Sequence, residues 1–125
     1  MADTLPQEHV LIVEDERALA HILSLKIQEL GVKCTIASNG IEAFQCLNNN
    51  GYTLVLLDLL LPQMDGFEIL QKMKEQKIDV PVIVLSVLSQ PEDIARAKEL
   101  GALEYFAKSS SSLSDIISAV KKYLA

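Results

Sequence analysis

Residues 53–58 read Thr53-Leu54-Val55-Leu56-Leu57-Asp58, an apolar run that ends in a carboxylate. Because apolar side chains follow one another, the run has no solvated face, and this predicts a parallel strand covered by helices on both sides. Residues 10–13 (Val-Leu-Ile-Val) and 82–85 (Val-Ile-Val-Leu) show the same pattern. Weaker strand patterns occupy residues 33–37 and 104–107. The sequence therefore predicts five strands.

Helical periodicity fills the segments between these strands. Asp65, followed three residues later by Glu68, predicts the cap of the third helix. The same spacing predicts Ser89 as the cap of the fourth helix, with Pro91 in the first turn, where a missing N–H costs nothing. Two apolar stripes at helical spacing predict the first and last helices. The first stripe consists of Leu19, Ile22, Leu23, Ile27 and Leu30, and Gly31 is expected to cap its C-terminal end. The second stripe consists of Leu113, Ile116, Ile117, Val120 and Leu124.

The order of these segments defines the fold class. Five strands alternate with five helices, which predicts an α/β fold, a three-layer αβα sandwich around a parallel sheet. In such sheets ligands bind where the strand order reverses, and the flavodoxin-like order 2-1-3-4-5 has this point between its first and third strands. A chain of 125 residues is long enough for one domain. We expect a single domain over residues 1–125, with a core from about residue 8 to residue 124.

Composition restricts the partners and the compartment. The net charge is −6, and since phosphate binding needs clustered Lys and Arg, we expect no direct nucleic-acid binding by this chain. No stretch approaches the ~18 apolar residues of a membrane span, and the N-terminus lacks a secretory signal pattern, so a cytoplasmic protein without membrane contact is expected. Cys34 and Cys46 fit no metal or redox spacing and are expected to be free thiols. His9 and His21 are expected at the surface.

Polar side chains follow the predicted strands. Glu14 and Asp15 follow the first strand, Asp58 the third, Ser86 the fourth and Lys108 the fifth. The carboxyl ends of parallel strands share one edge of the sheet, and ligands of open α/β sheets bind at that edge. In the predicted order the first and third strands are neighbours. Glu14 and Asp15 should therefore face Asp58 across a crevice.

The charges at this edge suggest its chemistry. Three carboxylates and one ammonium give −3 + 1 = −2. Crowded like charges raise one another's pKa and destabilise the fold, and a divalent cation removes the excess. Oxygen ligands without His or Cys favour Mg²⁺ or Mn²⁺ over zinc. A carboxylate beside Mg²⁺, Lys108 and the Ser86 hydroxyl can act as a nucleophile toward a phosphoryl group, which indicates phosphorylation of Asp58.

Two other classes of protein share parts of this pattern. A Mg²⁺-dependent phosphatase on a related fold usually has a second acidic residue two positions after its nucleophile, where this chain has Leu60, and a cap domain. Turnover of an external phosphomonoester would support that class. A flavodoxin-like cofactor binder needs a Ser/Thr/Gly-rich loop after the first strand, where this chain has Glu14-Asp15-Glu16. A yellow purified protein would support this second class.

The motifs together are similar to those of the response-regulator receiver family of two-component signalling systems, and the similarity is to chemotaxis regulators in particular. The most specific stretch is residues 58–66, Asp-Leu-Leu-Leu-Pro-Gln-Met-Asp-Gly, which resembles the family's phosphoacceptor loop. Further stretches in the right order are residues 10–16, residues 81–86, and Gly101-Ala102 leading to Tyr105 and Lys108. The resemblance covers the chain from about residue 8 to residue 124.

The resemblance implies a role for each matching residue. Asp58 resembles the phosphoacceptor and Lys108 the phosphoryl-binding lysine, while Ser86 and Tyr105 resemble the switch residues. Taken alone, Ser86 is equally typical of a strand-end hydroxyl bonded to backbone, and Tyr105 of a packed aromatic. The implied Mg²⁺ ligands are Glu14 through water, Asp15, Asp58 and the backbone carbonyl of Leu60.

The resemblance also implies how such a chain works. A histidine kinase or phosphotransfer protein would donate the phosphoryl group, and the surface of the fourth helix, fifth strand and fifth helix would change. The implied chemistry is self-phosphorylation and self-dephosphorylation, without an external substrate as in an enzyme. The output partner, or an output domain outside this chain, is not identified by the sequence.

Four residues depart from the family pattern. Val87 stands where a small residue is usual, and Leu60 and Leu88 are apolar where the family tunes the loss of phosphate. We therefore expect slow self-dephosphorylation. Ser109 follows Lys108 where the family has proline after a cis peptide bond. A cis bond before a residue other than proline costs about 2.5–4 kcal/mol, so we expect a trans bond and a lysine that still reaches Asp58 through its long stem.

Overall fold

The computed structural model describes residues 8–49 and 51–124 and contains five strands and five helices in alternation. The strands pair in parallel in the order β2-β1-β3-β4-β5, as predicted. Along the chain the elements are β1 (His9–Val13), α1 (Arg17–Gln28), β2 (Lys33–Ala37), α2 (Gly40–Leu47), β3 (Leu54–Leu57), α3 (Gly66–Glu75), β4 (Val82–Ser86), α4 (Pro91–Glu99), β5 (Glu104–Ala107) and α5 (Leu113–Lys122).

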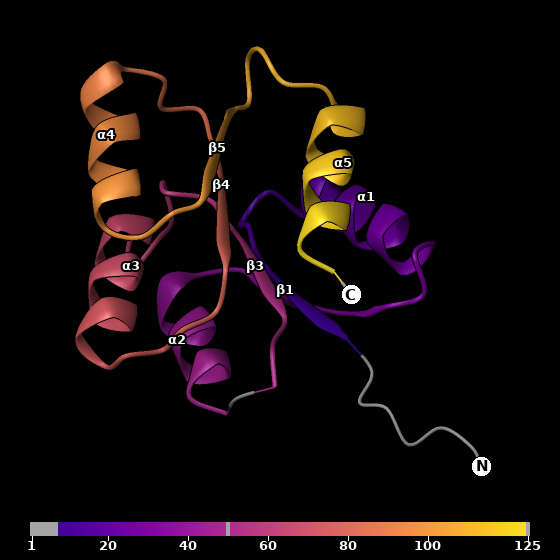
Figure 1. Ribbon diagram of the computed structural model, residues 1–125, viewed down its shortest axis with the longest axis horizontal. Coiled ribbons are helices and arrows are strands. Elements are labelled where there is room, and N and C mark those ends of the chain that lie inside the picture. The colour runs from indigo at the N-terminus through magenta and orange to yellow at the C-terminus, as the bar shows by residue number, and fades with distance from the viewer. Residues whose placement is uncertain (1–7, 50, 125) are drawn as a thin grey trace.

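Helices cover both faces of the sheet. Helices α2, α3 and α4 lie on one face, and α1 and α5 lie on the other (Figure 1). Successive strand residues point to opposite faces, so Leu11 and Val13 of β1 enter the first core while Val10 and Ile12 enter the second. All four of these side chains are buried. The absence of a solvated face, inferred from the apolar runs, is therefore confirmed for β1, β3 and β4.

The helix caps agree with the sequence in part. Asp65 caps α3 as predicted, because its carboxylate accepts a hydrogen bond from the Glu68 N–H at 2.9 Å. The prediction of Ser89 as the cap of α4 is wrong. The N-cap is Gln90, whose extended backbone (ψ 145°) is the conformation required before proline, and Pro91 is the first helical residue. Ser89 therefore lies one residue too early to reach the free N–H groups.

Two further predictions need correction. Helix α1 ends at Gln28, with Glu29 as its C-cap, so Gly31 lies beyond the cap position although its φ of +86° is in the left-handed region. His21 is exposed as expected, whereas His9 lies half-buried in β1. The His9 ring packs 4.5 Å from the Tyr52 ring. Within the described residues, no helix is both long and apolar enough to cross a bilayer.

Candidate functional site

The strands bring the predicted site residues to one edge of the sheet. Glu14 follows β1 and Asp58 follows β3, and since these strands are neighbours, the Asp58 N–H donates to the carbonyl of Val13 at 3.0 Å. Ser86 is the last residue of β4, and its carbonyl accepts a hydrogen bond from the N–H of Lys108 at 2.8 Å. The end of β4 and the residue that follows β5 therefore lie at the same edge of the sheet as Glu14 and Asp58.

Lys108 links the two buried carboxylates. Its ammonium lies 3.0 Å from Glu14 Oε1 and 3.2 Å from Asp58 Oδ2. The Glu14 and Asp58 side chains are 2% and 4% exposed, whereas the Lys108 side chain is 17% exposed, so both ion pairs are largely shielded from solvent. No peptide bond among the described residues is cis. Both predictions for this segment, a trans bond before Ser109 and a lysine that reaches Asp58, are therefore confirmed.

The acidic residues have the chemistry of a divalent cation site. One carboxylate oxygen each from Glu14, Asp15 and Asp58 lies within 4.8 Å of the others. The donors are all oxygen atoms, which suits Mg²⁺, and Asp15 is exposed and so leaves the site open to solvent. With Lys108 in place the local charge is still −3 + 1 = −2. The residues therefore fit a Mg²⁺ ion, which would balance this charge.

Burial and charge shift two pKa values at this site. Burial raises the pKa of Glu14, the Asp58 charge raises it further, and the hydrogen bond from Lys108 only partly opposes the rise. For Lys108, burial alone would lower the pKa, but the hydrogen bond to Glu14 and the charges of Asp58 and Glu14 raise it overall. The lysine is thus held in its charged form by the two carboxylates that it contacts.

The loop after Asp58 folds back on the site. The N–H of Leu60 donates to Asp58 Oδ1 at 3.1 Å, which leaves Oδ2 as the oxygen that contacts Lys108. At the other end of the loop, the N–H of Gly66 donates to the carbonyl of Leu59 at 2.9 Å. A Cβ atom on Gly66 would lie 2.6 Å from the Asp58 carbonyl oxygen, so only glycine fits there. Leu60 itself is 48% exposed.

The backbone of Leu88 joins the two predicted switch residues. Ser86 Oγ accepts a hydrogen bond from the Leu88 N–H at 3.2 Å, and the Tyr105 hydroxyl donates to the Leu88 carbonyl at 2.7 Å. Burial and the nearby charge of Asp93 raise the pKa of Tyr105, and its hydroxyl therefore remains a donor. The sequence did not indicate this role for Leu88, because a backbone group that bridges two side chains has no residue-type signature.

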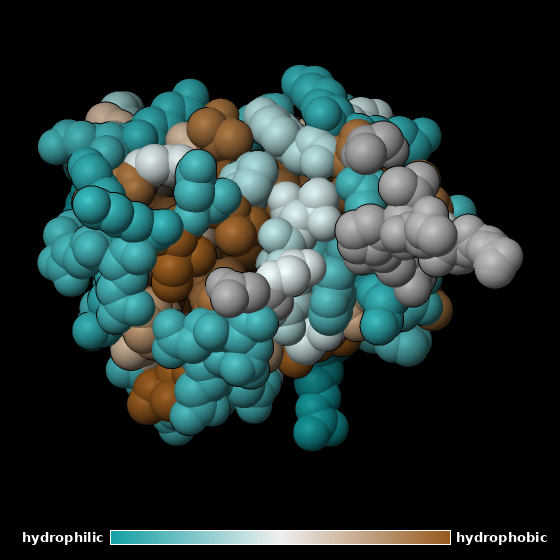
Figure 2. Space-filling model, turned by 60° about the horizontal axis from the view of Figure 1, so that its bottom comes forward, coloured by the Kyte–Doolittle hydropathy of each residue, from teal (hydrophilic) through white to brown (hydrophobic). Residues whose placement is uncertain are grey.

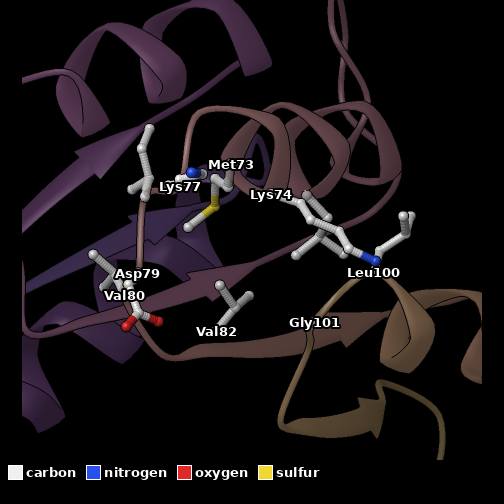
Figure 3. Close-up of a pocket in the computed structure, with 10 residues that line it drawn as sticks. Met73, Lys74, Lys77, Asp79, Val80, Val82, Leu100 and Gly101 are labelled. Carbon is white, nitrogen blue, oxygen red and sulfur yellow. The ribbon is translucent and has the colours of Figure 1, made fainter.

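A second concave region lies away from the acidic residues. Figure 2 shows the underside of the molecule, where hydrophobic side chains gather in a hollow framed by hydrophilic ones. A pocket of about 460 Å³ lies between the end of α3, the segment leading into β4 and the end of α4. Figure 3 shows the residues that line it. It lies near Val82, at the amino end of β4, and therefore at the edge opposite Asp58. Because none of its lining residues is Ser, Thr, Cys or His, the acidic edge remains the candidate site.

Comparison with known proteins agrees with the fold. The family model described as the response regulator receiver domain matches residues 10–121. Sporulation initiation phosphotransferase F of Bacillus subtilis is 38% identical over 117 residues, which cover 94% of each chain. The response regulator SaeR of Staphylococcus aureus is 33% identical over 121 residues, 92% of this chain and 53% of SaeR. This chain belongs to the response regulator receiver family.

Solved structures extend the comparison. The receiver domain of the Francisella response regulator 1452 is 30% identical, with a TM-score of 0.87 over 94% of this chain and 96% of that one. The receiver domain of a signal transduction histidine kinase from Syntrophus aciditrophicus is 34% identical, with a TM-score of 0.83 over 94% and 89% of the two chains. The chain spans about half the length of SaeR and 44% of the transcriptional regulatory protein YkoG of Bacillus subtilis. Members of the family are phosphoacceptor modules of two-component systems rather than typical enzymes.

Proposed function

We propose that Asp58 accepts a phosphoryl group from a histidine kinase or phosphotransfer protein and that this chain acts as a phosphorylation-dependent switch. The observation that carries the proposal is the position of the Lys108 ammonium between Glu14 and Asp58. A lysine held this close to a buried carboxylate can neutralise charge on a transferred phosphoryl group. The membership of the chain in the receiver family supports the same role.

The step itself is a displacement at phosphorus. A carboxylate oxygen of Asp58 forms a bond to phosphorus while the bond from phosphorus to the donor nitrogen breaks, and the nitrogen keeps the electron pair and takes up a proton. Glu14 (through water), Asp15, Asp58 and the Leu60 carbonyl would hold Mg²⁺, which when bound would neutralise charge on the phosphoryl oxygens. Lys108 stays in contact with the phosphorylated side chain and pairs with its new negative charge.

The bonds at Leu88 suggest how the surface responds. Ser86 lies at the end of the strand next to β3, so its hydroxyl could donate a hydrogen bond to a phosphoryl oxygen on Asp58. A turn of the Ser86 side chain toward that oxygen would lengthen the hydrogen bond that Ser86 Oγ accepts from the Leu88 N–H. The Leu88 carbonyl accepts a hydrogen bond from the Tyr105 hydroxyl, so a movement of Leu88 would alter this hydrogen bond. Tyr105 lies in β5, between α4 and α5. The change would therefore reach the surface made by α4, β5 and α5.

The chain would remove its own phosphate slowly. Leu60 and Val87 are 48% and 57% exposed, so both present apolar side chains to water that approaches the site. Neither side chain can hydrogen-bond an attacking water or orient it. The chemistry of the chain would thus be limited to self-phosphorylation and slow self-dephosphorylation.

Incubation with acetyl phosphate tests the proposal directly. The intact protein should gain the mass of one phosphoryl group in the presence of Mg²⁺ and none in EDTA. Asp58→Asn should gain nothing. Asp65→Asn is the matched control, because this residue belongs to the same loop but only caps α3, a role that asparagine also fills. Equal uptake by wild type and Asp58→Asn would overturn the proposal.

A further inference from the structure

The start of α2 touches the loop that follows Asp58. Gly40, the first residue of α2, is buried, and its N–H donates to the carbonyl of Pro62 over 3.3 Å. A Cβ atom on Gly40 would overlap the carbonyl oxygen of Met64 and lie 2.5 Å from the Met64 carbonyl carbon. Real Cβ atoms essentially never approach other atoms within 3.0 Å. Any side chain at position 40 must therefore displace either the helix or the loop.

The loop is tightly turned at the point of contact. The Pro62 carbonyl accepts hydrogen bonds from two N–H groups, that of Met64 at 2.9 Å and that of Gly40. Gln63 between them has a φ of 73°, in the left-handed region that non-glycine residues rarely occupy. Such a turn persists only where its surroundings hold it in place. Gly40, at the start of α2, helps to hold the turn in place through the hydrogen bond from its N–H to the Pro62 carbonyl.

Helix α2 is the firmer of the two partners. Ala43 and Leu47 are 0% and 2% exposed and fix the helix in the core. Its N-terminus is capped twice, since Asn39 Oδ1 accepts from the Glu42 N–H at 2.8 Å and Glu42 Oε1 accepts from the Ser38 N–H at 3.0 Å. The side chains of Leu60, Pro62 and Gln63 in the loop are instead exposed. A clash at Gly40 would thus move the loop more than the helix.

We propose that Gly40 is a positioning residue for the phosphoacceptor loop, acting from α2 on Asp58 and on the backbone of Leu60. The inference rests on the proposed function, because its readout is the Mg²⁺ site at these residues. Leu60 is tied to Asp58 by the hydrogen bond from its N–H, and Met64 lies four positions further along the same loop. A displacement that starts at Met64 therefore reaches a proposed metal ligand without any change to the acidic residues.

The test is a Mg²⁺ titration followed by the amide NMR signals of the loop. Gly40→Ala should raise the Kd for Mg²⁺ by about tenfold or more, as losses of supporting contacts around metal sites typically do. Gly31→Ala is the matched control: it also places a Cβ on a glycine, but with nothing within 4 Å and at a φ of +86°, so it should lower stability and leave the Kd unchanged.

The outcomes separate this inference from the proposed function. If wild type binds no Mg²⁺, the proposed function fails. If wild type binds and Gly40→Ala binds equally well, only the role of Gly40 fails.

A milder variant keeps the test decisive should Gly40→Ala not fold. Asn39→Ala removes the side-chain cap of α2 and should loosen the contact between Gly40 and Pro62, raising the Kd at least about twofold. Ser112→Ala removes the corresponding cap of α5 and should leave the Kd unchanged. Equal Kd values for both cap variants would overturn the inference.

Discussion

Replacing Lys108 by methionine should destabilise the Mg²⁺-free protein by about 2–3 kcal/mol at neutral pH. At an effective dielectric constant of about 20, an ammonium at 3.0 Å from Glu14 and 3.2 Å from Asp58 gains roughly 5 kcal/mol of gross attraction from each carboxylate. Desolvation of the lysine offsets much of this gain. Loss of one partner of a fully buried pair costs about 3–5 kcal/mol, and loss of an exposed pair at most about 1 kcal/mol. The Lys108 side chain is 17% exposed, so the cost of removing its ammonium should lie between these two values.

Urea unfolding followed by circular dichroism in EDTA measures this loss. Lys122→Met is the matched control, because its ammonium lies 3.3 Å from Glu104 but its side chain is 64% exposed, so its removal should cost less than about 1 kcal/mol. A domain of this size has about 5–15 kcal/mol of stability, so both variants should stay folded. Equal losses for the two variants would refute the argument from burial.

The pH dependence gives the same prediction a second check. Because the folded chain holds a proton on Glu14 more tightly than the unfolded chain, acidification from neutral pH stabilises the fold through this group. Lys108→Met removes the hydrogen bond that opposes the rise in the Glu14 pKa, so this gain should be larger in the variant. The loss in the free energy of unfolding caused by Lys108→Met should therefore be smaller at about pH 5 than at about pH 7.5. A difference that does not change with pH would contradict the electrostatic account.

Further changes test three separate parts of the molecule. Millimolar Mg²⁺ should raise the Tm of wild type, and an unchanged Tm would count against the site. Asp15→Asn should weaken Mg²⁺ binding and raise the stability of the Mg²⁺-free protein, because one repelling charge is gone. Leu60→Asn should shorten the lifetime of the phosphorylated form, measured by loss of labelled phosphate, since an amide can orient water; an unchanged lifetime would defeat that reasoning. Ser112→Ala should lower the free energy of unfolding by about 1 kcal/mol through loss of the α5 cap, and Ser114→Ala, at an exposed position, by much less.

The sequence predicted the sheet and its functional edge because both depend on local patterns. A short apolar run without a polar face is typical of a strand covered on both sides, and the residue after each run then falls at the carboxyl edge. This logic correctly brought Glu14, Asp58 and Lys108 together. The trans bond before Ser109 was also predicted, because the intrinsic cost of a cis bond is much higher before serine than before proline.

The features that were missed depend on distances in the folded chain. The contact between Gly40 and Met64 joins residues 24 positions apart, and a glycine that is required for space looks like any turn glycine in the sequence. The bonds of Leu88 to Ser86 and Tyr105 involve its backbone, which is the same in every residue type. Ser89 failed as a cap because Pro91 sets the first turn of α4, and a backbone constraint took precedence over the preference for serine.

The most direct test of the central claim is to identify the residue that carries the phosphoryl group. The protein is phosphorylated by a cognate histidine kinase or by acetyl phosphate with Mg²⁺, reduced with borohydride, digested and mapped by mass spectrometry. Borohydride reduces an aspartyl phosphate to homoserine, so the account predicts homoserine at position 58 and unmodified aspartate at positions 15 and 65. Homoserine at another aspartate, or a stable phosphate on serine or histidine, would contradict it.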